Sequence, residues 1–292
     1  MPVHDELGCR MKEFYETIPK TRLMRRTPVA IRIDGKAFHT FTRGFRRPFD
    51  PVLARSMWDT MKYLCENIQG CVLGYTQSDE ITLILTDYKT LSSDAWFGYE
   101  VQKMCSIAAS MTTMAFNKFF AQNIEMVDNH PAYGNASKEE EAAAYEETSY
   151  VPVYRKALEK GAMFDARCFN IPKEEVTNLI YWRQLDATRN SIQMVGQANF
   201  SHKELQNKSC SNIQDMLMEQ KGINWNNFPV CYKRGVCAIK VMKEVDLSPG
   251  QGVQYRSEWE IDTDIPIFKG DNREYIEELI WFNDGEGDES SE

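Results

Sequence analysis

The sequence is poor in the arrangements that build metal clusters and disulfide frameworks. It has four histidines, and its eight cysteines are scattered without a Cys-x-x-Cys pair, so zinc sites and disulfide frameworks are both disfavoured. No apolar run approaches the roughly 18 residues of a membrane-spanning helix, and residues 1–14 lack the apolar core of a signal peptide. We therefore expect a protein of the reducing cytoplasm without a membrane partner.

The charge of the chain is unevenly distributed. At 292 residues, 42% hydrophobic and 26% charged, the composition is that of an ordinary globular protein, with a formal net charge of −9. Six acidic residues and one lysine lie in residues 128–150, and five acidic residues lie in residues 284–292. By contrast, Lys20–Arg47 contains nine basic residues and one acidic residue, Asp34. A solvated surface is one interpretation of this basic block, but Arg32 lies within a strand pattern, which favours an anionic substrate.

Two aspartates follow strand-like runs. Residues 29–33 alternate up to Asp34, and a second run breaks at Ser78 and Asp79 before alternation resumes over residues 81–85. Each motif alone is also common in ordinary turns. Two carboxylates at the ends of neighbouring strands, however, suit Mg²⁺, which takes oxygen ligands from one or two carboxylates and from substrate phosphates. The pair therefore indicates metal-dependent nucleotidyl transfer.

The order of the expected elements is β-α-β-β-α-β. They are a strand over residues 29–34, a helix over 51–70, a strand pair over 71–85, a helix over 97–120 and a strand over 163–170. Asp50 followed by Pro51 is a typical helix start. This order predicts a ferredoxin-like α+β domain, in which the first and third strands are adjacent at the centre of the sheet. Asp34 and Asp79 then converge, as in the palm of polymerases and nucleotide cyclases.

The rest of the chain is expected to add a smaller region to this domain. Residues 122–162 are predicted to form an acidic insertion or lid, with a loop over 128–137 and a short helix over 138–144. A helix over 174–197, a further helix, and a strand over 229–240 with Lys233-Arg234-Gly235 at its middle follow. We expect a palm catalytic domain in residues 1–170, a C-terminal helix-and-strand region in 171–283 packing on it, and a disordered acidic tail in 284–292.

Six motifs occur in a fixed order along the chain. They are IRIDGKAFHTF, RPFD, GYTQSDE, FDAR, WRQLDATRNS and CYKRGV. Together they resemble the tRNA-histidine guanylyltransferase family, most closely its 3′-to-5′ polymerase-like members, which repair tRNA 5′ ends. The similarity spans roughly residues 25–240, and the pair DGK-x-FH and QSDE, about 45 residues apart, is its most specific part.

The resemblance implies a polymerase palm, with an antiparallel sheet and helices on one face, and two Mg²⁺ ions. Asp34 and Asp79 would be the catalytic aspartates and metal ligands, and Gly35 would add its backbone carbonyl. Glu80 is either an outer ligand behind this site or a strand-edge residue. The residues expected to bind the nucleotide are Asp34, Gly35, Lys36, Ala37, Phe38, His39, Arg47, Ser78, Asp79, Lys103 and Asn190. Those expected to bind RNA are Arg25, Arg26, Arg183 and Arg189.

Departures from the family motifs favour the repair branch. Trp182–Ser191 lacks the family's histidine and keeps Asn190 alone of its asparagines, and Gly98, Tyr99 and Glu100 stand where basic residues are typical. We therefore expect templated addition of nucleotides to the 5′ end of tRNA in the 3′-to-5′ direction, or guanylate addition there. GTP and ATP would be substrates, tRNA or a tRNA-like RNA the partner, and the enzyme a homo-oligomer (tetramer or dimer).

Three alternative functions remain open. The first is a dedicated tRNA-histidine guanylyltransferase. The second is a palm-type nucleotide cyclase, which would form a cyclic product from nucleotide alone and without RNA. The third is a non-catalytic RNA-binding module, which the intact Asp34, Ser78 and Asp79 disfavour.

Overall fold

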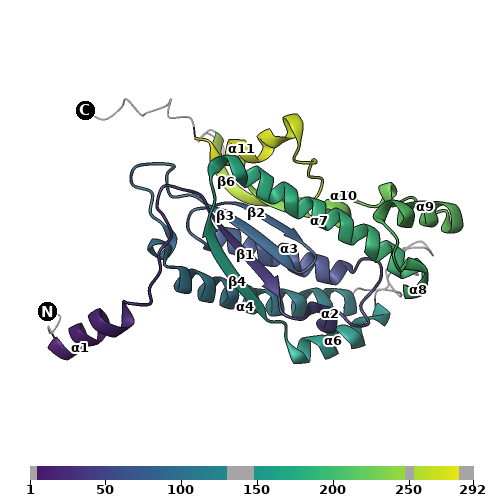
Figure 1. Ribbon diagram of the computed structural model, residues 1–292, viewed down its shortest axis with the longest axis horizontal. Coiled ribbons are helices and arrows are strands. Elements are labelled where there is room, and N and C mark those ends of the chain that lie inside the picture. Colours follow the sequence, from purple (N-terminus) through teal and green to yellow (C-terminus); the bar gives the residue numbers. More distant parts are fainter. Residues whose placement is uncertain (1–4, 130–147, 247–252, 283–292) are drawn as a thin grey trace.

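The computed structural model describes residues 5–129, 148–246 and 253–282. An antiparallel sheet of six strands, in the order β4-β1-β3-β2-β5-β6, forms its centre (Figure 1). The strands are β1 (Val29–Gly35), β2 (Cys71–Gln77), β3 (Glu80–Leu85), β4 (Phe164–Asn170), β5 (Val236–Asp246) and β6 (Val253–Asp262). Because β1 pairs with both β3 and β4, the first four strands have the ferredoxin-like order. The predicted α+β palm architecture is confirmed.

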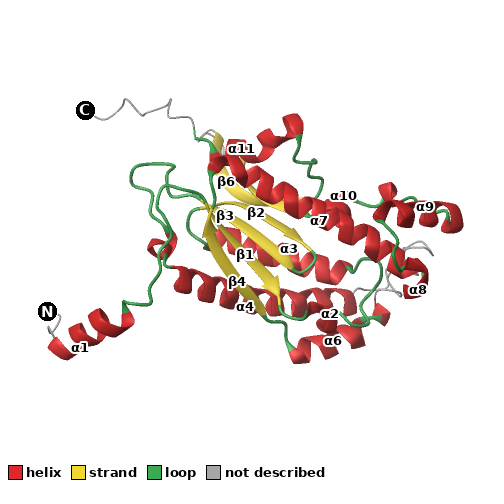
Figure 2. Ribbon diagram, in the orientation of Figure 1, coloured by secondary structure: helices red, strands yellow, loops and turns green. Residues whose placement is uncertain are grey.

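Helices cover both faces of the sheet (Figure 2). On one face, α3 (Pro51–Asn67), α4 (Val101–Asp128) and α6 (Val151–Lys160) bury Ile31 and Ile33 of β1. On the other, α7 (Lys173–Asn199) and α11 (Glu274–Ile280) bury Ala30, because successive residues of a strand point to opposite faces. The palm's own helices thus share one face, and the C-terminal helices take the other. The other described helices are α1 (Glu6–Met11), η1 (Lys12–Glu16), α2 (Phe38–Phe41), η2 (Trp96–Tyr99), α8 (His202–Leu205), α9 (Cys210–Lys221), η3 (Trp225–Asn227), α10 (Val230–Arg234) and η4 (Gly270–Arg273).

Helix α3 begins where the sequence predicts. The Asp50 carboxylate accepts a hydrogen bond from Leu53 N at 2.9 Å, and Pro51 occupies the first turn. The same carboxylate accepts from Arg46 N at 3.0 Å and from Tyr154 Oη at 2.7 Å. Asp50 therefore joins the N-terminus of α3 to the preceding loop and to α6.

Helix α7 extends beyond the sheet and carries a small separate core at its C-terminal end, where α8 and α9 lie (Figure 1). Val195 packs there with Ile213 and Leu217 of α9. Trp225 Nε1 donates a hydrogen bond to Ser191 Oγ at 3.0 Å. These contacts fix the α8–α9 segment relative to α7.

More of residues 122–162, predicted as an insertion, is helical than the sequence suggested. Helix α4 continues to Asp128, and α6 occupies residues 151–160 with Tyr154 buried against the core. The expected short helix over 138–144 and the acidic tail 284–292 lie outside the described residues. Strand β6 and helix α11 were not predicted individually, although Val253, Tyr255, Trp259 and Ile261 alternate in the sequence.

The tripeptide Lys233-Arg234-Gly235 does not lie within a strand, contrary to expectation. It ends helix α10, and β5 begins only at the next residue. Lys233 is buried, and its Nζ donates to Asn226 O at 2.6 Å. Gly235 (φ 83°, ψ −169°) has a conformation that essentially only glycine adopts. A Cβ there would lie 2.5 Å from the carbonyl oxygen of Thr76, so only glycine lets the backbone approach β2 this closely.

The cysteines are dispersed through the fold. All eight lie among the described residues without a disulfide, and Cys65, Cys71 and Cys237 are buried. Burial raises the pKa of the Cys65 thiol, which suppresses its reactive thiolate form. Separately, none of the described helices combines the length and apolarity needed to cross a membrane.

Replacing Gly235 with alanine should destabilise the protein, because the new Cβ would collide with the backbone of β2. We expect the free energy of unfolding to fall by about 1–3 kcal/mol from this collision, as measured by urea denaturation. Gly222→Ala is the matched control, since Gly222 also has a positive φ (66°) but nothing lies within 4 Å of a Cβ built there. Equal losses in the two variants would contradict the importance of the Thr76 contact.

Candidate active site

Backbone hydrogen bonds hold the turn after β1 to two neighbouring segments. Gly35 N donates to Asp79 O at 3.1 Å, and Lys36 N donates to Met163 O at 2.8 Å. A Cβ on residue 35 would lie 2.2 Å from the ring of Phe38, so only glycine permits this close approach. The end of β1 is therefore fixed against the β2–β3 turn and the start of β4.

Phe38 anchors this turn in the core. Its ring contacts those of Phe41, Phe116 and Phe164, with centroids 5.0, 5.6 and 5.1 Å away. The preceding Ala37 is in the left-handed conformation (φ 54°), and no side chain in the described part of the protein caps α2. The first N–H groups of α2 thus lack a side-chain acceptor, an arrangement that suits an anion.

The β2–β3 turn presents the second aspartate. Ser78 (φ 52°) donates from Oγ to Asp79 Oδ1 at 3.0 Å, and Thr76 Oγ1 donates to Glu80 O at 2.7 Å. Burial raises the pKa of Asp79, and the Asp34 carboxylate raises it further, while hydrogen bonds from the backbone and Ser78 oppose the shift. Like charges brought together at a partly buried site favour a bound cation.

Glu80 lies directly behind this pair of aspartates. It stands opposite Asp34 in the sheet, and its Oε1 lies 2.6 Å from Arg183 Nε while its Oε2 lies 3.7 Å from Arg32 Nε. Arg183 also contacts Asp186 at 2.8 Å. Burial raises the pKa of Glu80, whereas the ion pair with Arg183 lowers it. The carboxylate therefore faces arginines of the sheet and α7, which favours the outer, supporting role.

A cavity of about 630 Å³ opens beside both turns. Its lining includes seven of the residues expected to bind nucleotide: Gly35, Ala37, Phe38, His39, Arg47, Ser78 and Asp79. The Lys36 side chain is exposed and does not line it. Arg43, Arg46 and Gln197 also line the cavity and were not predicted individually. The two arginines belong to the basic block Lys20–Arg47, which was expected to face an anionic substrate. Nothing in the sequence indicated that Gln197 of α7 lines the same cavity.

A narrower cavity of about 100 Å³ adjoins the first. The two share Asp50, Leu53, Ser78 and Met194, and the narrower one is also lined by Asn190. Its aromatic wall is formed by Phe49 and Tyr232, whose rings stack with centroids 4.8 Å apart and planes at 5°. The structure thus brings Asn190 beside Ser78, although the two lie on different elements.

Lys103, which was expected to bind the nucleotide, does not line the nucleotide cavity. It lies on the first turn of α4, with Nζ 4.6 Å from the ring centroid of Phe97. That turn contacts the segment before β1, because Val101 N donates to Thr21 O at 2.9 Å. Asp34 lies near the other end of β1, so the length of this strand separates Lys103 from the aspartates.

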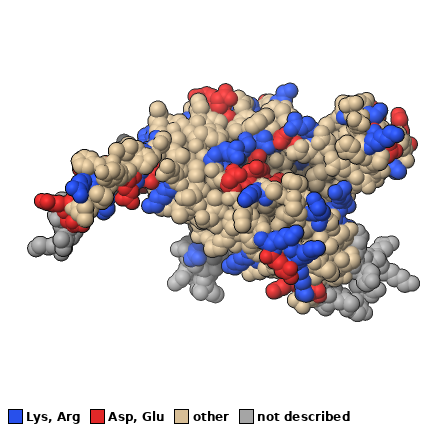
Figure 3. All heavy atoms as spheres, turned by 60° about the horizontal axis from the view of Figure 1, so that its bottom comes forward, with Lys and Arg blue, Asp and Glu red and all other residues tan. Residues whose placement is uncertain are grey.

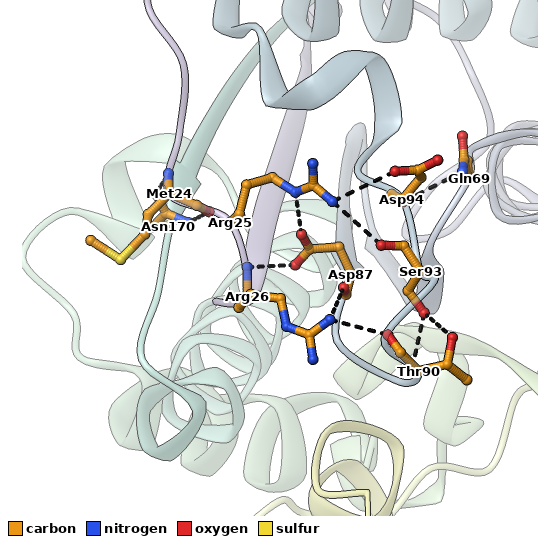
Figure 4. Close-up of polar contacts among 9 residues, drawn as sticks. All are labelled: Met24, Arg25, Arg26, Gln69, Asp87, Thr90, Ser93, Asp94 and Asn170. Atoms are coloured by element: carbon orange, nitrogen blue, oxygen red, sulfur yellow. Dashed lines mark hydrogen bonds and ion pairs between the residues drawn. The ribbon is translucent and has the colours of Figure 1, made fainter.

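Arg25 and Arg26, which were expected to bind RNA, surround a buried carboxylate at the far end of the sheet (Figure 4). Arg25 Nε lies 2.5 Å from Asp87 Oδ2, and Arg26 N donates to Asp87 Oδ1 at 2.8 Å. Asp87 is fully buried, and Arg26 Nη1 also donates to Thr90 O at 3.0 Å. These contacts connect the segment just before β1 to the loop after β3. The sequence did not reveal this structural role.

The two arginines predicted on α7 differ in accessibility. The side chain of Arg183 is 7% exposed and faces Glu80, whereas that of Arg189 is 61% exposed and contacts Asp186. Arg189 is therefore accessible to RNA and Arg183 is not. On the face shown in Figure 3, basic and acidic side chains lie intermixed, so no broad patch of one sign marks an RNA surface there.

The fold and site together define a class of enzyme. The sheet is antiparallel and ferredoxin-like, and it holds two aspartates at adjoining strand ends beside a cavity lined by arginines. This is the palm architecture of nucleotidyltransferases. A family model described as tRNAHis guanylyltransferase (Thg1) matches residues 8–172. The chain belongs to the Thg1 family and is a nucleotidyltransferase.

Two solved structures agree with this assignment, and the chain is also similar to a viral protein. A bacterial tRNAHis guanylyltransferase-like protein in complex with ATP is 40% identical, with a TM-score of 0.74 and coverage of 95% of this chain and 100% of the other. One in complex with GTP is 36% identical, with a TM-score of 0.71 and the same coverage. An uncharacterized protein of Acanthamoeba polyphaga mimivirus is 27% identical over 255 residues, 84% of this chain and 80% of the relative. The family prediction is confirmed.

Asp79→Asn should raise thermal stability when divalent cations are removed. The pKa of Asp79 is raised from its usual value near 3.8 in the folded protein, so wild-type stability is lost as pH rises through that elevated pKa. The variant should therefore melt higher than wild type at pH 7, and the difference should vanish below about pH 4. Melting curves from pH 3 to 8 in EDTA test this, with the exposed Asp271→Asn as control. A difference that does not change with pH would contradict it.

Arg183→Met should cost about 3–5 kcal/mol of unfolding free energy, because it leaves the buried Glu80 carboxylate without its partner. Arg189→Met is the matched control: it removes an exposed arginine from the same Asp186, where a loss of about 0–1 kcal/mol is expected. Chemical denaturation measures both. The double variant Glu80→Met with Arg183→Met should recover part of the loss, and equal losses in the two arginine variants would show that burial of the pair is unimportant.

Proposed function

We propose that this enzyme adds nucleotides to the 5′ end of tRNA in the 3′-to-5′ direction, using the opposite strand as template. The observation that carries the proposal is the cavity in which the Gly35–His39 turn and the Ser78–Asp79 turn face Arg43, Arg46 and Arg47. Such a site matches a nucleoside triphosphate, whose charge needs cations on one side and metal-binding oxygens on the other. Family membership and bacterial relatives solved with ATP and GTP support the same substrates.

The residues present fit two Mg²⁺ ions. Carboxylates of Asp34 and Asp79 and the carbonyl of Gly35 are the hard oxygen donors that Mg²⁺ prefers. The described residues contain no cluster of three or more acidic, histidine or cysteine side chains able to hold a metal alone, so nucleotide phosphates would complete the coordination. When bound, the ions would activate the attacking hydroxyl and neutralise charge on the phosphates.

The protein's own groups position the reactants. Arg43 and Arg47 would hold the triphosphate by charge-assisted hydrogen bonds, with the N–H groups of the first turn of α2 and the Ser78 hydroxyl beside them. Activation of the tRNA 5′-monophosphate with ATP releases pyrophosphate, and attack by the 3′-hydroxyl of the incoming nucleotide then forms the phosphodiester and releases AMP. No protein nucleophile is needed, so catalysis rests on positioning and electrostatics.

Base pairing, rather than protein contacts to base edges, would select the nucleotide. The altered segment Trp182–Ser191 retains Asn190, which lines the narrow cavity beside Ser78, and lacks the family's histidine. Phosphate contacts then need only to place the duplex end. We expect the enzyme to act as a homo-oligomer in the cytoplasm.

The deciding assay compares 5′-truncated tRNAs of several identities with full-length histidine tRNA that lacks only its extra guanosine. Each is incubated with each nucleotide and ATP, and products are resolved at single-nucleotide length. Extension of every truncated tRNA by the base complementary to its template supports repair. Extension confined to the histidine tRNA, whatever its template base, would indicate a dedicated guanylyltransferase, and a cyclic product without RNA would indicate a cyclase.

Asp34→Asn and Asp79→Asn should each lower the rate of nucleotide transfer at least about a thousandfold. Each removes a metal-binding charge where several kcal/mol of charge stabilisation are at stake, without changing side-chain volume. Single-turnover extension of a truncated tRNA measures the loss, and circular dichroism verifies the fold. Asp271→Asn, on the remote η4, should retain the wild-type rate, and near-normal transfer by either active-site variant would refute the two-metal assignment.

A further inference from the structure

A second depression, of about 580 Å³, adjoins the nucleotide cavity at the C-terminal end of α7. We call it the α8 groove, and its polar lining consists of Arg47, Gln193, Gln197, His202, Gln206, Asn207 and Lys208. Arg47 and Gln197 line the nucleotide cavity as well. The two spaces are therefore adjacent, and Arg47 and Gln197 lie between them.

The α8 groove contains no carboxylate in its lining. The nearby Glu204 is engaged elsewhere, since its Oε2 accepts hydrogen bonds from Ser201 N at 2.7 Å and Ser201 Oγ at 2.6 Å in the cap of α8. The polar groups that remain are amides, an imidazole and the cations Arg47 and Lys208, and Phe200, Leu205 and Ile213 form the apolar part of the lining.

The groove is open and rests on a rigid base. Gln193, Gln197, His202 and Lys208 are all exposed, so the space does not enclose a ligand. Beneath them, the core of Val195 with α9 holds the α8–α9 segment against α7. A fixed, shallow surface with hydrogen-bond donors and cations from several elements suits an extended polyanion better than a small molecule.

We propose that the α8 groove binds the phosphate backbone of the RNA strand adjacent to the 5′ end on which the enzyme acts. This inference rests on the proposed function, because it places the RNA whose terminus must meet Asp34 and Asp79. Lys208 and His202 contact successive phosphates, and the amides of Gln193 and Gln197 donate to phosphate or ribose oxygens. Arg47 stands at the junction between this strand and the nucleotide.

The test uses Lys208→Ala and Lys208→Glu, with Lys203→Ala as matched control. Lys203 lies on α8 next to His202 and carries the same charge, but does not line the groove. Affinity for a 5′-truncated tRNA is measured across a range of KCl concentrations, and affinity for a nucleoside triphosphate is measured separately. Melting temperatures verify that each variant is folded.

Lys208→Ala should weaken tRNA binding about three- to tenfold and reduce the slope of log affinity against log salt by about 1. Lys208→Glu should weaken binding further, while nucleotide affinity stays at the wild-type value in both. Adding His202→Ala should enlarge the loss, because it removes a ring N–H donor from the groove.

Three results would overturn the inference. A salt slope of Lys208→Ala equal to those of wild type and Lys203→Ala would place the RNA elsewhere. A fall in nucleotide affinity without a fall in tRNA affinity would make the groove part of a nucleotide site. Wild-type protein that binds no tRNA would remove both this inference and the proposed function, whereas tRNA binding that depends on Lys208 without any extension would refute the proposed function alone.

Discussion

The buried ion pair between Glu80 and Arg183 is the contact on which the rest of the site depends. Glu80 follows Asp79 in the chain and stands opposite Asp34 in the sheet, so fixing its carboxylate determines the position of both aspartates. Arg183 belongs to α7, whose later turns carry Asn190 to the narrow cavity. Two buried charges tolerate little displacement, because either alone would be poorly solvated. The pair therefore sets the register between helix and sheet more than it adds to stability.

Opposite charges line the nucleotide cavity. Asp79 comes from the β2–β3 turn, and Arg43, Arg46 and Arg47 come from the loop before α3. Asp34 lies in β1 next to Gly35, which also lines the cavity. The geometry is complementary to a ligand that carries cations at one end and bare phosphate oxygens at the other, which is the form of a metal-bound nucleotide.

Short-range patterns were sufficient to predict the elements that carry the aspartates. Alternation over residues 29–33, and the cap formed by Asp50 and Pro51, reflect interactions within a few residues of the chain. Ion-pair partners are different, because Arg183 and Glu80 are 103 residues apart, and Arg25 lies 62 residues from its partner. An arginine has the same sequence signature whether it is buried against a carboxylate or exposed to RNA. The position of Gly235 outside a strand was also not predicted, because its close contact is with Thr76 of β2, which is distant in the sequence.

Asp50 links three parts of the molecule through a single side chain. Its carboxylate accepts hydrogen bonds from the loop that carries Arg46, from the start of α3, and from Tyr154 of α6. Substitutions at Asp50 and Tyr154 are therefore not energetically independent. The hydrogen bond that is lost when the Tyr154 hydroxyl is removed is also lost when the Asp50 carboxylate is removed, so the two changes in unfolding free energy do not add. During evolutionary divergence, a chain that gave up one partner would relax selection on the other, so the two positions are expected to change together.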